Sequence, residues 1–136
     1  MVKTGRLMLD TNAYTALLAG DRRIAELLAS CEAVLVSPVM IGELYDGFLG
    51  GSRQTENRLM LERFREKPRT LLVPITDNSS EWFAEIKRML RLKGKPIPMN
   101  DVWIAASCME HGARLVSFDK HFAAIDGLLR WDGTAD

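Results

Sequence analysis

The sequence has few cysteines and histidines, and it has no long apolar run. Its 136 residues include two cysteines, Cys31 and Cys108, and two histidines, His111 and His121. A small secreted domain held by disulfides usually carries more cysteines at regular spacing, so we expect both thiols to be reduced and buried. No apolar run approaches the roughly 18 residues of a membrane span, and residues 1–5 lack the apolar core of a signal peptide. The sequence therefore predicts a cytoplasmic protein.

A net charge of one sign is also absent. Lys and Arg total 18, and Asp and Glu total 18, which gives a formal net charge of zero. Because no overall field attracts the chain to a polyanion, any contact with nucleic acid must come from a local patch. Hydrophobic residues make up 47% of the chain, which excludes a disordered protein. With no repeat, low-complexity tract or linker, we expect one domain over residues 4–132.

Short apolar runs alternate with longer segments of helical periodicity. The expected strands are the apolar runs at residues 6–9, 33–36, 71–73, 115–116 and, more weakly, 128–131. One helix is expected directly after residues 10–12. The others are expected at about 21–28, 38–50, 55–67, 78–92 and 102–109. This alternation indicates an α/β fold, a three-layer sandwich with a central, mainly parallel sheet of about five strands.

Individual residues predict details of two helices. Leu59, Leu61 and Phe64 are expected to anchor the fourth helix to the core. The last helix is apolar nearly all round, so we expect it to be buried, with Asn100 as its N-cap.

Four acidic residues are expected to meet at one edge of the sheet. Asp10 follows the first strand and Asp119 follows the fourth, and parallel sheets bind ligands beyond the carboxyl ends of their strands. Asp101 lies in the first turn of the last helix. In the helix at 38–50, Glu43 projects onto the border of the apolar stripe, from which it can reach inward at the rim.

Each acid has a simpler explanation when it is taken alone. Asp10 can cap the next helix, and Asp119 can be a turn residue. Asp101 can interact favourably with the helix dipole at the N-terminus of its helix, and Glu43 can be a solvent-exposed acid on its helix. Their coincidence favours a metal site, because two unit charges 4 Å apart repel by about 4 kcal/mol at an effective dielectric of about 20. A bound cation reverses that repulsion, and hard oxygen ligands select Mg²⁺ or Mn²⁺.

The two histidines do not indicate a zinc site. His111 is expected at the C-terminus of a helix, where it interacts with the dipole. His121 lies near Asp119 in the sequence, but a single nearby histidine packs or hydrogen-bonds more often than it ligates. The sequence therefore predicts a site of carboxylate ligands.

Four segments carry a resemblance to a known family. They are LDTN at residues 9–12, IGELYDG at 41–47, NDVWIAA at 100–106 and LVSFDKHF at 115–122. In this order they resemble PIN-domain proteins, specifically the VapC-type toxins of bacterial and archaeal toxin–antitoxin pairs, over about residues 6–131. One departure is Trp103, at a position that is often smaller and aliphatic. It either packs as core or bears on substrate access.

The resemblance implies a metal-dependent endoribonuclease with a PIN-like sandwich fold. It assigns catalysis and the binding of Mg²⁺ or Mn²⁺ to the four acids, and it matches Thr11, Asn12 and Ser117 to polar residues that orient carboxylates. A metal-activated water would cleave single-stranded or structured RNA, with Glu43 helping to orient the nucleophile. The resemblance also implies homodimerisation and inhibition by a small VapB-like antitoxin that enters the active-site groove.

Candidates for contacts with the RNA backbone are weaker, because exposed basic residues usually only solubilise a protein. Near the predicted rim they are Arg22, Arg23, Arg53 and Lys120. Exposed apolar residues on the third and fourth helices are candidates for the dimer or antitoxin surface, and core packing competes equally for them.

Two other α/β families are excluded because the chain lacks the acidic residues that they require. A phospho-acceptor receiver domain needs paired acids after the first strand and an aspartate after the third, but the chain has only Asp10 at the first place and Val73-Pro74 at the second. A haloacid-dehalogenase phosphatase needs a second aspartate where Asn12 stands. The alternative left open is a PIN fold that kept RNA or protein binding and lost catalysis.

Overall fold

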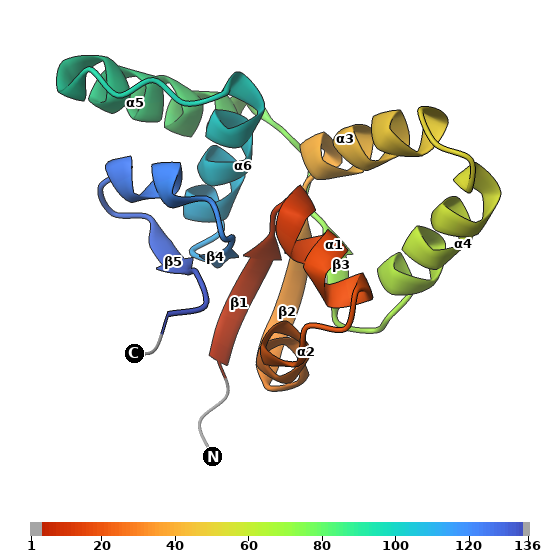
Figure 1. Ribbon diagram of the computed structural model, residues 1–136. Helices are drawn as coiled ribbons and strands as arrows, with labels where there is room; N and C mark the ends of the chain where they lie inside the picture. Colours follow the sequence, from red (N-terminus) through yellow and green to blue (C-terminus); the bar gives the residue numbers. More distant parts are fainter. Residues whose placement is uncertain (1–3, 135–136) are drawn as a thin grey trace.

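The central feature of the computed structural model, which describes residues 4–134, is a parallel sheet between two layers of helices (Figure 1). The strands are β1 (Thr4–Leu9), β2 (Cys31–Val36), β3 (Thr70–Leu72), β4 (Arg114–Val116) and β5 (Leu129–Trp131). Their order is β3-β2-β1-β4-β5, and every pairing is parallel. This confirms the predicted α/β sandwich with a five-stranded sheet. Residues 1–3, part of the stretch in which no signal peptide was expected, lie outside the described residues.

The helices are close to their predicted positions. Within residues 4–134 they are α1 (Thr11–Leu18), α2 (Arg22–Ala29), α3 (Pro38–Leu49), α4 (Gln54–Arg65), α5 (Asp77–Lys93), α6 (Met99–Glu110) and the 3-10 helix η1 (Lys120–Ala124). The 3-10 helix was not expected, since five residues are too few to show a helical period. No helix among the described residues is long and apolar enough to span a membrane.

Side chains of the sheet alternate between two hydrophobic cores. Leu7 and Leu9 of β1 pack with α1, α2, α3 and α4, whereas Met8 between them packs with α5 and α6. The two groups of helices accordingly lie on opposite sides of the sheet (Figure 1). Because both faces of the sheet are covered, the middle of each strand is apolar on both sides, which is why the strands appear as near-continuous apolar runs in the sequence.

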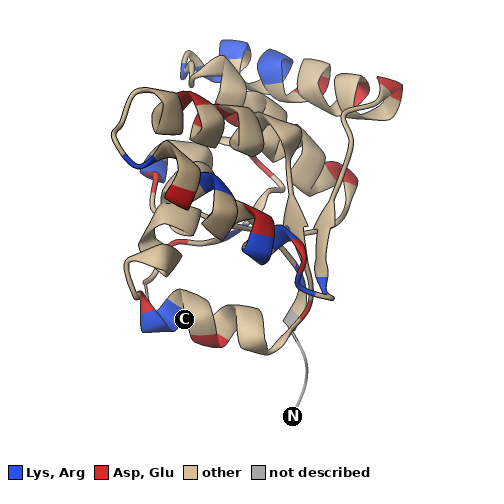
Figure 2. Cartoon of the chain, turned by 90° about the vertical axis from the view of Figure 1, so that its right-hand side faces the viewer, with Lys and Arg blue, Asp and Glu red and all other residues tan. Residues whose placement is uncertain are grey.

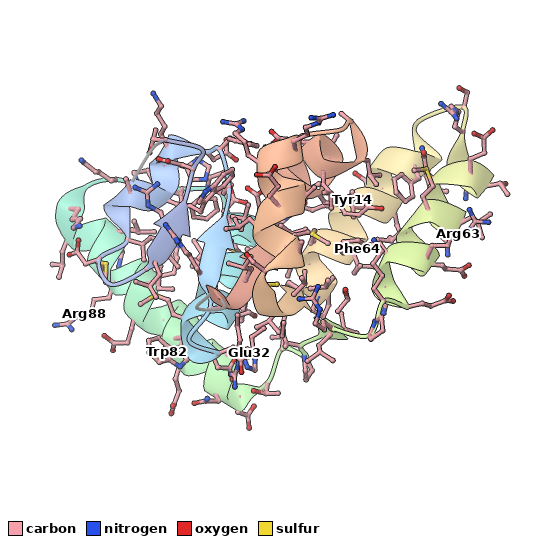
Figure 3. All side chains as sticks on the ribbon, turned by 90° about the horizontal axis from the view of Figure 1, so that it is seen from below. Tyr14, Glu32, Arg63, Phe64, Trp82 and Arg88 are labelled. Atoms are coloured by element: carbon pink, nitrogen blue, oxygen red, sulfur yellow. The ribbon has the colours of Figure 1, made fainter. Side chains whose placement is uncertain are left out.

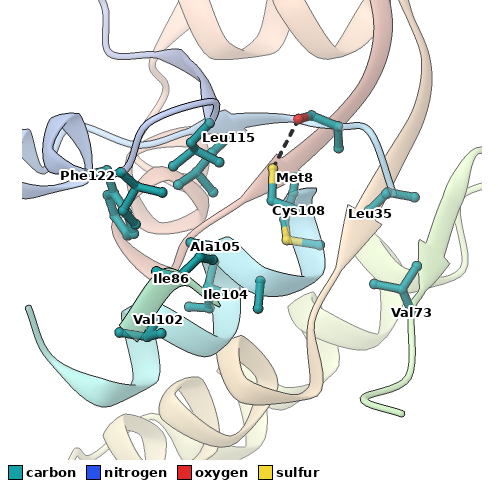
Figure 4. Packing of buried hydrophobic residues seen from close by; sticks show 14 of the residues in the cluster. Met8, Leu35, Val73, Ile86, Val102, Ile104, Ala105, Cys108, Leu115 and Phe122 are labelled. Carbon is teal, nitrogen blue, oxygen red and sulfur yellow. Dashed lines mark hydrogen bonds between the residues drawn. The ribbon is translucent and has the colours of Figure 1, made fainter. Parts of the chain in front are cut away.

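The core on the α5–α6 side includes nearly the whole of α6 (Figure 4). The residues of α6 from Val102 to Cys108 are buried except Trp103, as the apolar pattern predicted. Both cysteines are buried and free, which confirms the expectation of reduced thiols. The Cys108 thiol donates to the carbonyl oxygen of Ala113 at 3.2 Å, and burial raises the pKa of this thiol to about 12.

On the opposite face, α4 is anchored by an aromatic pair. The rings of Tyr14 and Phe64 meet edge to face, with centroids 5.1 Å apart (Figure 3). Leu61 and Phe64 are 1% and 6% exposed, as predicted, but the prediction for Leu59 was wrong, since it is 44% exposed. Leu59 lies about 200° around the helix from Leu61 and therefore faces away from the core.

The prediction that Asn100 caps α6 was also wrong. The helix begins at Met99, directly after Pro98, and no side chain caps it. The N-cap is therefore Pro98, two residues before the predicted Asn100, and its fixed φ of −55° is compatible with that place. The Asn100 amide instead donates to Glu43 Oε2 at 3.5 Å.

Candidate functional site

The strand order reverses between β1 and β4. From this point β2 and β3 extend to one side, and β5 extends to the other. At such a reversal the connections leave in opposite directions, so a crevice opens beyond the carboxyl ends of the strands. A pocket of about 520 Å³ opens there. Its lining residues are Asp10, Thr11, Asn12, Glu43, Pro98, Met99, Asn100, Asp101 and Asp119. All four predicted acids therefore line one pocket.

Asp10 is the most buried of the four acids, with 3% of its surface exposed. Its Oδ1 accepts from the Ala13 backbone N–H at 2.8 Å and caps α1, while its Oδ2 accepts from the Ser117 hydroxyl. The simple explanation of Asp10 as a helix cap is thus correct, and it is compatible with a place in the pocket. The cap and the hydroxyl together hold the carboxylate in one orientation.

Two more acids are held by the residues that follow Asp10. The Thr11 hydroxyl donates to Glu43 Oε1 at 2.7 Å, and the Asn12 amide donates to Asp119 Oδ2 at 3.3 Å. Because α1 starts at the end of β1, one short segment reaches both α3 and the loop after β4. The three polar residues matched by the family resemblance thus each contact a different acid.

The partner of Asp101 is a residue that sequence reasoning left aside. Nε2 of His121 lies 2.9 Å from Asp101 Oδ2, because η1 folds back from the end of β4 toward the first turn of α6. The only sequence signal was the proximity of His121 to Asp119, and the contact itself crosses between two elements. Asn100, predicted as a cap, is a second pocket residue whose place was missed.

Burial and mutual repulsion raise the pKa of two of the acids. For Asp10, desolvation is the main cause and the charges of Asp119 and Asp101 add to it, against the opposing hydrogen bonds from Ser117 and Ala13. For Asp101, desolvation again leads and Glu43 and Asp119 add repulsion, against the attraction of His121. Negative charge is therefore unfavourable in this pocket without a counter-ion.

The donor set fits a hard divalent cation. Ligand atoms of Asp101, Asp119 and His121 lie within 4.8 Å of one another, and the carboxylates of Asp10 and Glu43 line the same pocket. Carboxylate oxygens are the ligands that such ions prefer, and a cation removes the repulsion that raises the carboxyl pKa values.

Three of the four basic residues predicted near the rim lie outside the acidic pocket. Arg23 pairs with Asp21 at 2.9 Å, Arg53 pairs with Glu56, and Arg22 is exposed at the start of α2. None of these arginines is among the described residues that line the acidic pocket. Basic and acidic segments are interspersed over the face shown in Figure 2. This face therefore carries no broad field of one sign.

Lys120 lies next to the acidic pocket rather than in it. It lines a neighbouring pocket of about 270 Å³ together with His121, Lys93 and Lys95. His121 thus borders this basic pocket and contacts an acid of the other one. Lys93, one of the other lysines of this pocket, is already paired with Asp126 at 2.6 Å.

Trp103 packs against α5. Its ring stacks on Phe83 with centroids 4.0 Å apart, and its side chain is partly buried. Of the two interpretations left open for this residue, the structure supports packing between α5 and α6.

Comparisons with known proteins point to one family. The family model described as "PIN domain" matches residues 7–128. Ribonuclease VapC5 of Mycobacterium tuberculosis is 27% identical over 120 residues, covering 88% of this chain and 87% of the relative. Ribonuclease VapC4 of the same organism is 32% identical over 90 residues, covering 66% of this chain and 69% of the relative.

Solved structures show the same fold. The structure of VapBC-1 from nontypeable Haemophilus influenzae superposes with a TM-score of 0.82 at 25% identity, covering 93% of this chain and 97% of the other. A chain of the Rickettsia felis VapBC2 structure, solved with a DNA fragment from its promoter, superposes with a TM-score of 0.81 at 24% identity and the same coverage. The fold and the acidic pocket are consistent with a PIN domain. Because the family model matches residues 7–128, most of the chain, the chain belongs to the PIN-domain family.

Proposed function

We propose that this chain is a metal-dependent endoribonuclease, the toxin of a VapBC-type toxin–antitoxin pair. The observation that carries the proposal is the meeting of four carboxylates in one pocket at the reversal point of the sheet. Relatives named Ribonuclease VapC, at 27% and 32% identity over most of their length, support RNA as the substrate. The domain that performs this function spans residues 4–132. Because its substrate is RNA, we propose that it acts in the cytoplasm.

The four acids would hold the cation, which we propose to be Mg²⁺ or Mn²⁺. When bound, it supplies Lewis acidity toward a phosphate oxygen and lowers the pKa of a water. Glu43 lies on the rim and is oriented by the Thr11 hydroxyl, so it is placed to orient the attacking water or to take its proton. Ser117 and Asn12 hold Asp10 and Asp119 in position, which limits the rearrangement needed during the reaction.

The surface of α3 and α4 supports a protein partner. Leu49, Leu59 and Met60 are 66%, 44% and 40% exposed on these two helices. Contiguous exposed apolar patches are typical of interaction sites, and these three side chains are the candidates for one. The titles of the superposing structures name VapBC complexes, so we propose that a VapB-like antitoxin and a second copy of this chain are the partners.

A nuclease assay tests the proposal and separates it from a PIN fold that only binds. The wild-type protein is expected to cleave single-stranded RNA with Mn²⁺ or Mg²⁺ and to stop when EDTA is added. Asp101→Asn should fold and lose at least about 100-fold in rate, since it changes a ligand itself rather than a residue that orients one. The matched control is Asp46→Asn, which changes an exposed acid on α3 outside the pocket lining and should keep wild-type activity.

Equal activity in rigorously purified Asp101→Asn would refute the assignment of the site. Metal-independent RNA binding without cleavage by the wild type would instead favour the binding module. Cleavage that persists in EDTA would contradict the metal dependence.

A further inference from the structure

We propose that His121 is a ligand of the divalent cation, beside Asp101 and Asp119, and that it makes the site prefer Mn²⁺ to Mg²⁺. This inference rests on the proposed function and names the ion of the same site. The starting observation is that Asp101, Asp119 and His121 offer three ligand atoms within 4.8 Å of one another.

The distances suit one ion with three protein ligands. Ligand atoms bound about 2.1 Å from an octahedral ion lie about 3.0 Å apart when adjacent and about 4.2 Å apart when opposite. Nε2 of His121 lies 2.9 Å from Asp101 Oδ2, which is the spacing of adjacent ligands. The three ligand atoms lie within 4.8 Å of one another, slightly more than the spacing of two opposite ligands. A small rotation of one side chain removes this difference.

The chemistry of His121 differs from that of the other residues that contact the acids. Asp10, Glu43 and Asp119 accept hydrogen bonds from a serine hydroxyl, a threonine hydroxyl and an asparagine amide, respectively. Those groups donate to the carboxylates through O–H or N–H, and they offer a cation only hard oxygen atoms. Asp101 alone among the four acids has an imidazole as its partner, and a neutral imidazole nitrogen is a common metal ligand.

Imidazole changes which ion fits the site. Mg²⁺ prefers hard oxygen ligands and gives up its waters reluctantly. Nitrogen ligands suit first-row transition ions better than they suit Mg²⁺. A site of carboxylates plus one imidazole should therefore gain affinity for Mn²⁺ over a site of carboxylates alone, and gain little for Mg²⁺. The His121 side chain is 33% exposed, but its Nε2 is buried beside Asp101, so this nitrogen already faces the acids.

Pulsed EPR of bound Mn²⁺ tests the proposal directly. With one equivalent of Mn²⁺, the wild-type protein should show the ¹⁴N modulation of a directly coordinated imidazole. The signal should disappear in His121→Asn. It should remain in His111→Asn, the matched control, because His111 caps the opposite end of α6.

Calorimetric titration supplies a second measurement. His121→Asn should weaken Mn²⁺ binding by about tenfold or more and weaken Mg²⁺ binding less, so that the ratio of the two dissociation constants changes. Bound Mn²⁺ without ¹⁴N modulation in the wild type would overturn the inference, whether or not the variant folds. An unchanged Mn²⁺ to Mg²⁺ ratio in a folded variant would overturn it as well.

The same experiments keep the two proposals apart. If Mn²⁺ does not bind the wild type, or binds Asp101→Asn equally well, the proposed function itself fails and this inference fails with it. If Mn²⁺ binds, depends on Asp101, and shows no nitrogen ligand, the proposed function stands and only the role of His121 is refuted.

Discussion

Replacing Asp101 with asparagine should make the metal-free protein more stable and the metal-loaded protein less stable than the wild type. Asp101 lies in a pocket where burial and two other acids raise its pKa, so its charge opposes folding when no cation is present. Asparagine has nearly the same shape and no charge. The substitution thus removes repulsion, and it also removes a metal ligand.

The magnitude follows from the geometry of the acids. A ligand atom of Asp101 lies within 4.8 Å of one of Asp119. Two unit charges at that distance repel by about 0.9 kcal/mol in water and by about 3.5 kcal/mol at an effective dielectric of about 20. The acids line a pocket that opens to solvent, so we take a repulsion of about 1.5 kcal/mol, between these two limits. Loss of a favourable charge in the first turn of α6 costs about 0.5 kcal/mol. The amide oxygen of the asparagine can still accept a hydrogen bond from His121 Nε2, so the contact that Asp101 makes with this imidazole at 2.9 Å is kept.

The expected net gain for the metal-free variant is about 1 kcal/mol, or a rise in Tm of about 3 °C for a chain of this length. Adding a cation at about 100 times its Kd stabilises the wild type by about 2.7 kcal/mol and the variant far less. The order of the two melting temperatures should therefore invert.

Thermal unfolding of chelator-treated protein, followed by circular dichroism with and without Mn²⁺, measures both effects. Asp46→Asn serves as the control and should respond to Mn²⁺ like the wild type. A metal-free Asp101→Asn that melts below the wild type would refute the reasoning, since it would mean that the acids do not repel one another in the folded state.

Three further predictions use the same structure. Ser117→Ala should destabilise the protein by about 1–3 kcal/mol in urea unfolding, because the buried Asp10 carboxylate loses a donor; an unchanged midpoint would contradict this. The stability advantage of Asp101→Asn over the metal-free wild type should grow as the pH rises from about 4. A carboxyl group whose pKa is raised in the folded state stabilises folding below its unfolded pKa, and the wild type loses this contribution as Asp101 ionises. A stability difference independent of pH between about 4 and 7 would count against this prediction. At pH 8 a disulfide reagent should leave Cys108 unmodified in the folded protein and modify it on unfolding, since burial raises the pKa of its thiol to about 12; rapid reaction in the native state would disprove the burial argument.

Local patterns were enough to predict the layers of the fold and the placement of two acids. Apolar runs and helical periods depend on a few neighbouring residues, so the strands and the buried helix α6 were predictable. Asp10 and Asp119 follow directly from the ends of β1 and β4, because the carboxyl ends of parallel strands lie at one edge of the sheet. Glu43 depended more on the family resemblance, since a rim position on a helix is also that of an ordinary surface acid.

Details that depend on neighbouring elements were less predictable. Leu59 fits an apolar pattern but faces away from the core, and Asn100 has a capping side chain but lies inside the first turn. The predicted basic rim had the same weakness, because Arg23 and Arg53 are engaged by acids close to them in the sequence. In each case the residue type was suitable, and its direction was decided by what packs beside it.

The sequence by itself determined that this is a parallel α/β protein with acids at the ends of its strands, because those features are encoded over short distances along the chain. Only the tertiary structure decided which side chains meet. Ser117 contacts Asp10 across 107 positions, Thr11 contacts Glu43 across 32, and His121 contacts Asp101 from a 3-10 helix that no pattern predicted. These contacts depend on strand register and on where strand order reverses, which are properties of the packed sheet rather than of any one segment.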